Sequence, residues 1–382
     1  MPLRVSLPFN VYYGENEEAA RFLVENTELR KYKPPIERIK ANTDKEFVEN
    51  PDSIQKILYL DQPDLIVTYG YPEVPVLGVE LCAEAPTGHD IFQRTARVVA
   101  SAEFGTPFAF VFPEKKWVER EKANRWDTYN PLPLRALLQI SRIHKTPILS
   151  FFWSADQMKG DPKQGYLICD SKYPNLPSRK DPEMEQMIQF VNLVIEYVVS
   201  RKNFSDMMFD PLILGREERM WRDYSDRVGT KEWSPLTTCK KLETKDLKDF
   251  VRKQTGRSVA LPAHVEARKE TVIYDVDSKT FRSDPYAGNL AGIDYLQCRN
   301  GPTIRHRYRN LVMNFAQVPF KDIAEKYQRF YDHDCPFRSG YKEVDRYLNL
   351  HLREGCRFTK QKELRTFCFL SDVLVFADNL LY

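Results

Sequence analysis

Residues 63–113 carry the pattern that most constrains the fold of this 382-residue chain. Asp64 opens the apolar, β-branched run Leu65–Tyr69, which predicts a strand. A glycine and two prolines then predict a turn, and the run Val76–Ala85 predicts a second strand. Two neighbouring strands joined by a short turn are therefore the expected centre of the fold.

Acidic residues occupy one side of the second expected strand. Successive side chains of a strand point to opposite faces, so Glu80, Cys82 and Glu84 share one face and their apolar neighbours share the other. A carboxylate that is buried without a partner is costly. We therefore expect a cation, a hydrogen-bond network or solvent on the side that holds these two carboxylates.

A helix is expected directly after the second strand. Residues 87–90 supply the chemistry of a helix start, and Gly105 followed by a proline supplies a stop. Apolar residues recur between them at helical spacing, which predicts a packed stripe. The polar side of the helix carries Gln93, Arg94 and Arg97. A buried strand over Pro107–Phe112 completes the order strand, turn, strand, helix, strand.

The residues of this stretch resemble a known motif. Pro63-Asp64, followed after fifteen residues by Glu80-Leu81-Cys82, resembles the PD-(D/E)xK signature of restriction-endonuclease-like phosphodiesterases. The pair Gln93-Arg94 on the helix and the order of elements are similar to that family's core as well. The resemblance covers roughly the first third of the chain. It implies an α/β fold with a restriction-endonuclease-like mixed sheet flanked by helices.

The same resemblance implies roles for individual residues. Asp64 and Glu80 would bind Mg²⁺, with Mn²⁺ as the alternative ion, and catalytic roles would fall to Asp64, Glu80, Gln93 and Arg94. Cys82 stands where the family usually has lysine, so a basic residue has to come from elsewhere. Arg94 is the expected replacement, and the alternatives are Arg97, His89, Lys115 and Lys116. The candidates for a further acidic group are Glu17, Glu18, Glu25 and Glu84.

Composition and simple motifs indicate the cellular compartment of the protein and argue against membrane-spanning and nucleotide-binding functions. The net charge is +3, which neither demands nor excludes a nucleic-acid partner. Seven scattered cysteines favour reduced thiols in a cytoplasmic protein. We expect no membrane span, because no run of ~18 apolar residues occurs, and no signal peptide at the N-terminus. No phosphate-binding loop of the P-loop or dinucleotide type occurs either.

Two regions are expected along the chain. Residues 1–155 would form the catalytic core, and residues 156–382 would form a mainly helical (α+β) region for DNA contact and dimerisation. The core should also contain a strand over Leu3–Val11, a helix over Asn16–Glu28, a helix over Leu132–Ile143 and a strand over Pro147–Trp153. The second region should contain helices over Glu183–Arg201, Leu214–Arg227 and Thr244–Thr255 and a strand over Thr271–Val276.

Two clusters in the second half of the chain have possible ligands. Arginines suit bidentate contacts with phosphate, and those expected to bind nucleic acid are Arg97, Arg299, Arg305, Arg307 and Arg309. The alternative for the later four is an arginine-rich surface paired to nearby acids. His333, Cys335, His351 and Cys356 offer zinc ligands, but their spacing resembles no standard finger, so ordinary packing is favoured.

The expected function follows from the resemblance. It implies a magnesium-dependent endonuclease that hydrolyses phosphodiester bonds of double-stranded DNA, as a sequence-specific restriction enzyme and a homodimer. One alternative is a catalytically inactive, DNA-binding protein that retains the fold, which the cysteine at position 82 favours. A second alternative is a nuclease that acts on RNA or on single strands.

Overall fold

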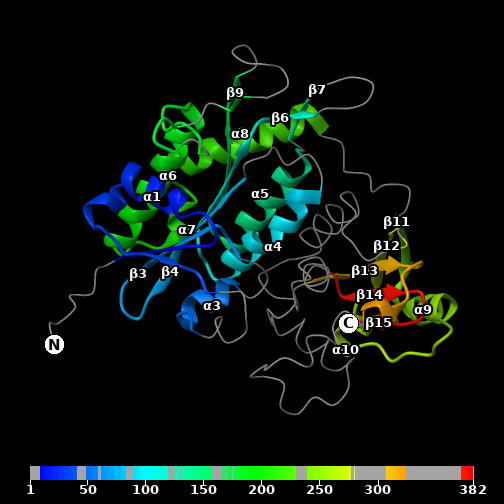
Figure 1. Cartoon of the computed structure of the whole chain (residues 1–382). Helices are drawn as coiled ribbons and strands as arrows, with labels where there is room; N and C mark the ends of the chain where they lie inside the picture. Colours follow the sequence, from blue (N-terminus) through cyan, green and yellow to red (C-terminus); the bar gives the residue numbers. More distant parts are fainter. Residues whose placement is uncertain are drawn as a thin grey trace. The chain divides into compact units, whose positions relative to one another are not determined.

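A computed structural model of the chain (Figure 1) divides it into two compact units. Unit 1 comprises Met1–Lys40, Val48–Leu58 and Gln62–Gly229, and unit 2 comprises Ala41–Phe47, Tyr59–Asp61 and Thr230–Tyr382. The structure describes residues 9–40, 49–58, 62–82, 89–118, 125–129, 131–156, 166–167, 170–173, 176–228, 239–276, 279, 307–323 and 371–381.

Unit 1 is built on a six-stranded mixed sheet with the strand order β2-β1-β3-β4-β5-β8. Its strands are β1 (Phe9–Tyr13), β2 (Ile36–Arg38), β3 (Leu65–Tyr69), β4 (Val74–Leu81), β5 (Phe108–Pro113) and β8 (Ile148–Trp153). The β3 strand is antiparallel to both β1 and β4, whereas β4, β5 and β8 run parallel. Two short antiparallel ribbons accompany the sheet. One consists of β6 (Lys115–Val118) and β7 (Arg125–Thr128), and the other of β9 (Ala155–Asp156) and β10 (Tyr166–Leu167).

Helices cover both faces of this sheet. They are α1 (Glu17–Asn26), α3 (Asp52–Leu58), α4 (His89–Glu103), α5 (Leu132–His144), α6 (Pro182–Val199), α7 (Phe204–Met207) and α8 (Pro211–Val228), with a short 3₁₀ turn η1 (Glu28–Lys31). Figure 1 shows α4 and α5 on one side of the strands and α1 and α6 on the other. The expected order strand, turn, strand, helix, strand is confirmed by β3, β4, α4 and β5.

Close packing between α4 and the sheet depends on one glycine. A Cβ atom at Gly78 in β4 would lie 2.6 Å from the Phe108 ring and 3.1 Å from the Ser101 hydroxyl of α4. Phe108 and Ser101 are themselves fully buried. The missing side chain therefore lets α4 approach the middle of the sheet, next to the position of Glu80.

The edge strand β8 is closed by polar side chains from α6 and α8. Glu183 Oε2 accepts the backbone N–H of Phe152 at 3.1 Å, and Arg216 Nε donates to the Ser150 carbonyl at 2.6 Å. Arg216 and Glu183 pair at 2.7 Å with almost no exposure, and the guanidinium lies over the Phe151 ring. An exposed strand edge is a template for pairing with other chains, and these contacts remove that edge.

This closure explains where unit 1 ends. The sequence predicted a boundary near residue 155, but the structure places the division after Gly229. Helices α6 and α8 belong with the sheet because their buried charged groups satisfy β8. Residues 156–181 are rich in lysine, proline, glycine and aspartate, a composition that is typical of a linker. No local pattern in the sequence shows that the helices after this segment pack on the same core.

Unit 2 contains a five-stranded mixed sheet with the order β11-β12-β13-β14-β15. Its strands are β11 (Cys239–Glu243), β12 (Glu270–Asp275), β13 (Arg309–Phe315), β14 (Val373–Phe376) and β15 (Leu380–Leu381), and its helices are η2 (Thr244–Asp246), α9 (Leu247–Thr255) and α10 (Ala263–Glu266). The strands β12, β13 and β14 are parallel. The α+β region expected over residues 156–382 is thus divided, with α6, α7 and α8 in unit 1 and this sheet with its short helices in unit 2. The whole chain is α/β with two mixed sheets flanked by helices.

No helix in the part of the chain that the structure describes is long and apolar enough to cross a membrane.

The buried pair between Arg216 and Glu183 makes a stability prediction. We expect Arg216→Met to lower the free energy of unfolding by about 3–5 kcal/mol, because it leaves a buried carboxylate without its main partner. Arg219→Met is the matched control, since Arg219 binds the same Glu183 at 2.9 Å but is half exposed, and it should cost less than about 1 kcal/mol. Urea unfolding measures both values, and equal losses would contradict this account.

Candidate active site at the β3–β4 hairpin

The hairpin brings Asp64 and Glu80 together. Asp64 directly precedes β3, Glu80 is the penultimate residue of β4, and the register pairs Leu65 with Val79. Asp64 Oδ2 accepts the backbone N–H of Leu81 at 2.7 Å. The two carboxylates that the sequence predicted to converge therefore lie at the same end of the hairpin, although fifteen residues separate them in the chain.

Two arginines of α4 neutralise Glu80, which is only 1% exposed. Arg94 Nε donates to Glu80 Oε1 at 3.0 Å, and Arg97 Nη1 contacts the same oxygen directly. The two arginines are three residues apart, so a helix presents them on one face. Arg97 Nη1 also lies 3.9 Å from Asp64 Oδ1. One guanidinium nitrogen therefore reaches both carboxylates.

Asp64 holds its proton more tightly than an ordinary aspartate does. The pKa of Asp64 is raised to about 7, first by burial and then by the negative charge of Glu80, and these causes outweigh the opposing effects of Arg97, the Leu81 N–H and Arg94. In the described part of the chain Glu80 Oε2 is buried and has no hydrogen-bond partner. A buried acceptor without a partner is unfavourable, so a hydrogen-bond donor or a cation at Glu80 Oε2 would be stabilising.

The structure changes the roles expected for the helix residues. Arg94, the expected replacement for the motif lysine, does lie at the carboxylates. Arg97 was expected to contact nucleic acid, but it is paired with Glu80. The backbone of Gln93 and of His89 lies in α4, while their side chains are outside the described residues. Lys115 lies in the short strand β6, 3.5 Å from Glu114.

Cys82 cannot act as a charged group here. It is 4% exposed, and its pKa is raised well above the ordinary value of a thiol, first by burial and then by the negative charge of Glu80. The thiol stays neutral near neutral pH, so it supplies neither the positive charge of the usual lysine nor a thiolate nucleophile.

The other acidic candidates do not join the pair. Glu17 is bound by Arg21 within α1, and Glu25 is bound by Lys172 at 2.6 Å. Glu18 is exposed on the same helix, and Glu84 lies outside the described residues. Among the described residues no group of three or more histidine, cysteine, aspartate and glutamate side chains could hold a metal ion. The expected zinc candidates at residues 333–356 are also outside the described residues.

Two of the arginines expected to bind DNA in unit 2, Arg307 and Arg309, form ion pairs within the unit. Arg307 is 1% exposed at its side chain and pairs with Asp372 at 2.9 Å, as does Arg268 at 2.8 Å. Arg309 is 11% exposed at its side chain and pairs with Glu270 at 3.3 Å. Both guanidinium groups are thus engaged in ion pairs within unit 2, and their contact with nucleic acid stays a prediction. Arg299 and Arg305 lie outside the described residues.

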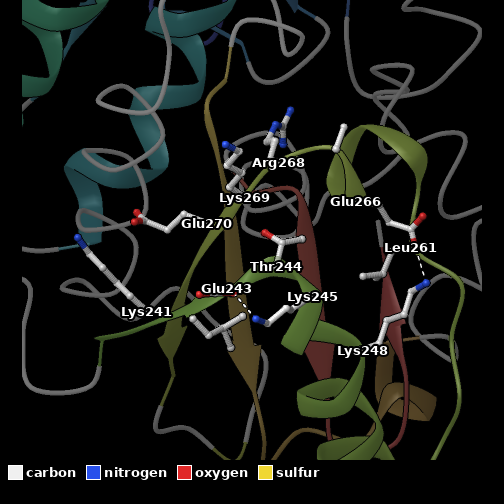
Figure 2. A pocket seen from close by; sticks show the side chains of 12 residues that line it. Lys241, Glu243, Thr244, Lys245, Lys248, Leu261, Glu266, Arg268, Lys269 and Glu270 are labelled. Carbon is white, nitrogen blue, oxygen red and sulfur yellow. Dashed lines mark ion pairs between the residues drawn. The ribbon is translucent and has the colours of Figure 1, made fainter.

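A basic hollow of about 880 Å³ lies in unit 2 (Figure 2). Four exposed lysines line it, Lys241 from β11, Lys245 from η2, Lys248 from α9 and Lys269 just before β12. Lys245 pairs with Glu243 at 2.6 Å, and Lys248 pairs with Glu266. Sequence reasoning missed this hollow because its lysines come from separate elements and form no run.

Comparisons with protein-family models, with curated proteins and with solved structures give no match to this chain.

The Asp372 cluster makes a pH prediction. Burial alone would raise the pKa of Asp372, but Arg307 and Arg268, together with the Leu311 N–H, hold it below its ordinary value. A lowered pKa in the folded state stabilises the protein fully above the unfolded pKa of about 3.9, and this contribution is lost as the pH falls through the folded pKa. Unit 2 should therefore unfold more easily as the pH drops below about 4.

The matching variant is Asp372→Asn. It should lower the free energy of unfolding at pH 7 by about 3–5 kcal/mol, because two buried guanidinium groups lose their anion. The free energy of unfolding of this variant should also change less with pH below pH 4 than that of the wild-type protein. Asp249→Asn is the control, because Asp249 pairs with Arg252 on an exposed helix surface. Urea unfolding between pH 3 and pH 7 measures both effects. An acid dependence unchanged in Asp372→Asn would contradict the assignment.

Proposed function

We propose that this protein is a divalent-metal-dependent endonuclease of the PD-(D/E)xK type that hydrolyses phosphodiester bonds of double-stranded DNA. The observation that carries the proposal is the meeting of Asp64 and Glu80 at one end of the β3–β4 hairpin, beside the arginines of α4. The order of β3, β4, α4 and β5 supports it, because the motif resemblance implies the same order.

The carboxylate pair fits a hard divalent ion. The arginines bind Glu80 Oε1, and a backbone N–H binds Asp64 Oδ2. Glu80 Oε2 and Asp64 Oδ1 are therefore the oxygens that would coordinate the metal ion. Carboxylate oxygens suit Mg²⁺ or Mn²⁺ better than Zn²⁺. When bound, such an ion would polarise the phosphate and lower the pKa of an attacking water.

The arginines have two tasks in this proposal. Arg94 and Arg97 fix the Glu80 carboxylate through charge-assisted hydrogen bonds, so that its second oxygen is held in place. Arg94 is 29% exposed at its side chain, and it replaces the missing motif lysine by placing positive charge near the scissile phosphate. Preorganised positive charge of this kind stabilises the charge that develops in the transition state.

The narrower proposal is a sequence-specific restriction enzyme that works as a homodimer. Two identical sites related by two-fold symmetry would each cut one strand of a short duplex sequence. A homodimer that binds a symmetric site would convert a supercoiled plasmid into discrete linear products rather than a smear.

A second candidate is a nuclease-like protein that binds DNA without cutting it. The neutral Cys82 favours it, because the usual lysine is missing, and so do the two guanidinium groups that already neutralise Glu80. Action on RNA or on single strands is the third candidate, and single-stranded substrates separate it from the first.

Plasmid cleavage tests the proposed function. We expect the full-length protein to cut supercoiled DNA in Mg²⁺ or Mn²⁺ and to stop in EDTA. Asp64→Asn and Glu80→Gln keep the shapes of the side chains but remove the charges, and each should lower the rate at least ~100-fold. Gel electrophoresis of the plasmid forms over time measures the rate.

Glu25→Gln is the matched control, because it removes an exposed carboxylate that binds Lys172. It should cut like the wild-type protein. Wild-type rates in Asp64→Asn and Glu80→Gln would show that these residues do not form the site. Duplex binding in EDTA without cleavage in either ion would instead support the second candidate.

A further inference from the structure

The basic hollow of unit 2 has a fixed frame. Its rim follows β11, η2 and the start of α9 on one side and the residues that lead into β12 on the other (Figure 2). The two sides are joined where the backbone N–H of Thr244 donates to the Lys269 carbonyl at 2.9 Å. Thr244 is buried, and its hydroxyl bonds to the Thr271 hydroxyl at 2.9 Å and accepts from the Asn310 amide at 3.1 Å. The lysines of the rim therefore extend from a well-anchored backbone.

The acidic residues that line the hollow are neutralised within unit 2. Each of the three glutamates has a cationic partner: Lys245 for Glu243 at 2.6 Å, Lys248 for Glu266, and Arg309 for Glu270 at 3.3 Å. The buried Arg268, which also lines the hollow, is likewise balanced by Asp372 at 2.8 Å. These pairs leave little negative charge in the hollow to oppose an anion.

Two lysines of the rim have no such partner. Lys241 of β11 and Lys269 are both exposed, and neither is paired with a carboxylate of the residues that the structure describes. The hollow therefore carries an excess of positive charge at these two positions, and the described contacts of unit 2 do not use it. An anionic ligand would supply the missing partner.

The other residues that line the hollow narrow the class of anion. A pocket for a small organic ligand is mostly apolar, whereas charged side chains dominate this lining. Single-stranded nucleic acid is held by aromatic rings that stack on its bases, and no aromatic residue is among the described residues of the lining. Lysine is a hydrated point charge on a flexible stem, which suits contacts with backbone phosphates. The lining thus favours the phosphates of a duplex.

We infer that this hollow is a contact for duplex DNA, in which Lys241 and Lys269 neutralise backbone phosphates. The inference rests on the proposed function for the identity of the ligand. Duplex DNA carries one negative charge per about 1.7 Å of its axis, so lysines on opposite sides of a hollow can each meet a phosphate. Such contacts hold and orient a duplex but carry no sequence information. The hollow therefore supplies affinity rather than sequence specificity.

The test is duplex binding by the full-length double variant Lys241→Gln/Lys269→Gln. A fluorescent DNA of about 40 base pairs and mixed sequence is the probe, in EDTA, between about 50 and 300 mM salt. Each phosphate contact contributes about 0.9 to the slope of log affinity against log salt. We therefore expect a slope shallower by about 2 and an affinity at least ~10-fold weaker at about 0.1 M salt.

The matched control is Lys253→Gln/Arg257→Gln, which removes the same charge from unit 2. Both residues are exposed and lie at or just beyond the C-terminal end of α9, whereas the hollow is lined by the start of this helix. This variant should keep the wild-type slope. Equal melting temperatures of the three proteins, expected because all four side chains are on the surface, exclude unfolding as the cause of weaker binding.

A second variant should strengthen binding. Glu243→Gln removes the partner of Lys245, and both side chains are largely exposed. The released ammonium group can then contact a further phosphate, so the slope should become steeper by about 0.9 and the affinity should rise. Loss of structure would not tighten binding, and an affinity equal to or weaker than that of the wild-type protein would count against the inference.

Binding in EDTA and cleavage in Mg²⁺ or Mn²⁺ are separate measurements, so this inference and the proposed function can fail separately. A protein that shows the expected slopes but cuts no plasmid would support the hollow and remove the proposed function. A Lys241→Gln/Lys269→Gln variant with the wild-type slope would overturn the inference, even in a protein that cuts plasmid. A wild-type protein that binds single strands but no duplex would overturn it as well. Displacement of the duplex by poly-glutamate as readily as by unlabelled duplex would indicate an acidic protein partner instead.

Discussion

The structure of unit 1 depends on the neutralisation of a carboxylate inside its sheet. Glu80 is 1% exposed in β4, and two arginines of α4 reach its Oε1 atom. Helix α4 therefore has to lie against β4 with Arg94 and Arg97 toward the sheet, and Gly78 allows this close approach. Asp64 reaches the same place because the hairpin register sets it beside Leu81. The candidate site is thus a consequence of how the core is packed.

Three carboxylates among the described residues, two of them buried and Asp64 partly buried, share one arrangement. Asp64, Glu183 and Asp372 each accept the backbone N–H of a strand residue, namely Leu81, Phe152 and Leu311, and each lies near arginine. At Asp372 the surroundings lower the pKa, which indicates a structural anion that is well compensated. At Asp64 the pKa is raised instead, and the adjacent Glu80 Oε2 lacks a partner. The negative charge of Asp372 is therefore well compensated by its neighbours, whereas Glu80 Oε2, beside Asp64, lacks a partner. The Asp64–Glu80 pair is for this reason the candidate for binding a cation.

The local part of the fold was predictable from the sequence. The run Leu65–Tyr69 is apolar and β-branched, and the helix after residue 88 has start and stop residues, so β3 and α4 lie where these patterns predict them. The convergence of Asp64 and Glu80 was expected from the motif resemblance, and the hairpin register accounts for it, because it aligns the start of β3 with the end of β4. The need for a cation near Glu80 follows from the cost of burying a charge, and Arg94 and Arg97 were both among the expected sources of positive charge.

Long-range pairing was not predictable. Arg307 and Arg309 stand in a dense arginine cluster that is typical of a nucleic-acid surface, yet they pair with Asp372 and Glu270, which are remote in sequence. The closure of β8 by Glu183 and Arg216 extends unit 1 far beyond the expected boundary for the same reason. In each case a charged residue forms an ion pair with a residue that is remote in sequence, and no local sequence pattern shows this pairing.

The most direct test of the central claim is anomalous diffraction from crystals of the protein soaked in Mn²⁺. The account predicts a manganese peak about 2.0–2.2 Å from Asp64 Oδ1 and Glu80 Oε2, with Arg94 and Arg97 still on Glu80 Oε1. A site without manganese at a saturating concentration, with the guanidinium groups of both arginines filling the space between the carboxylates, would contradict it.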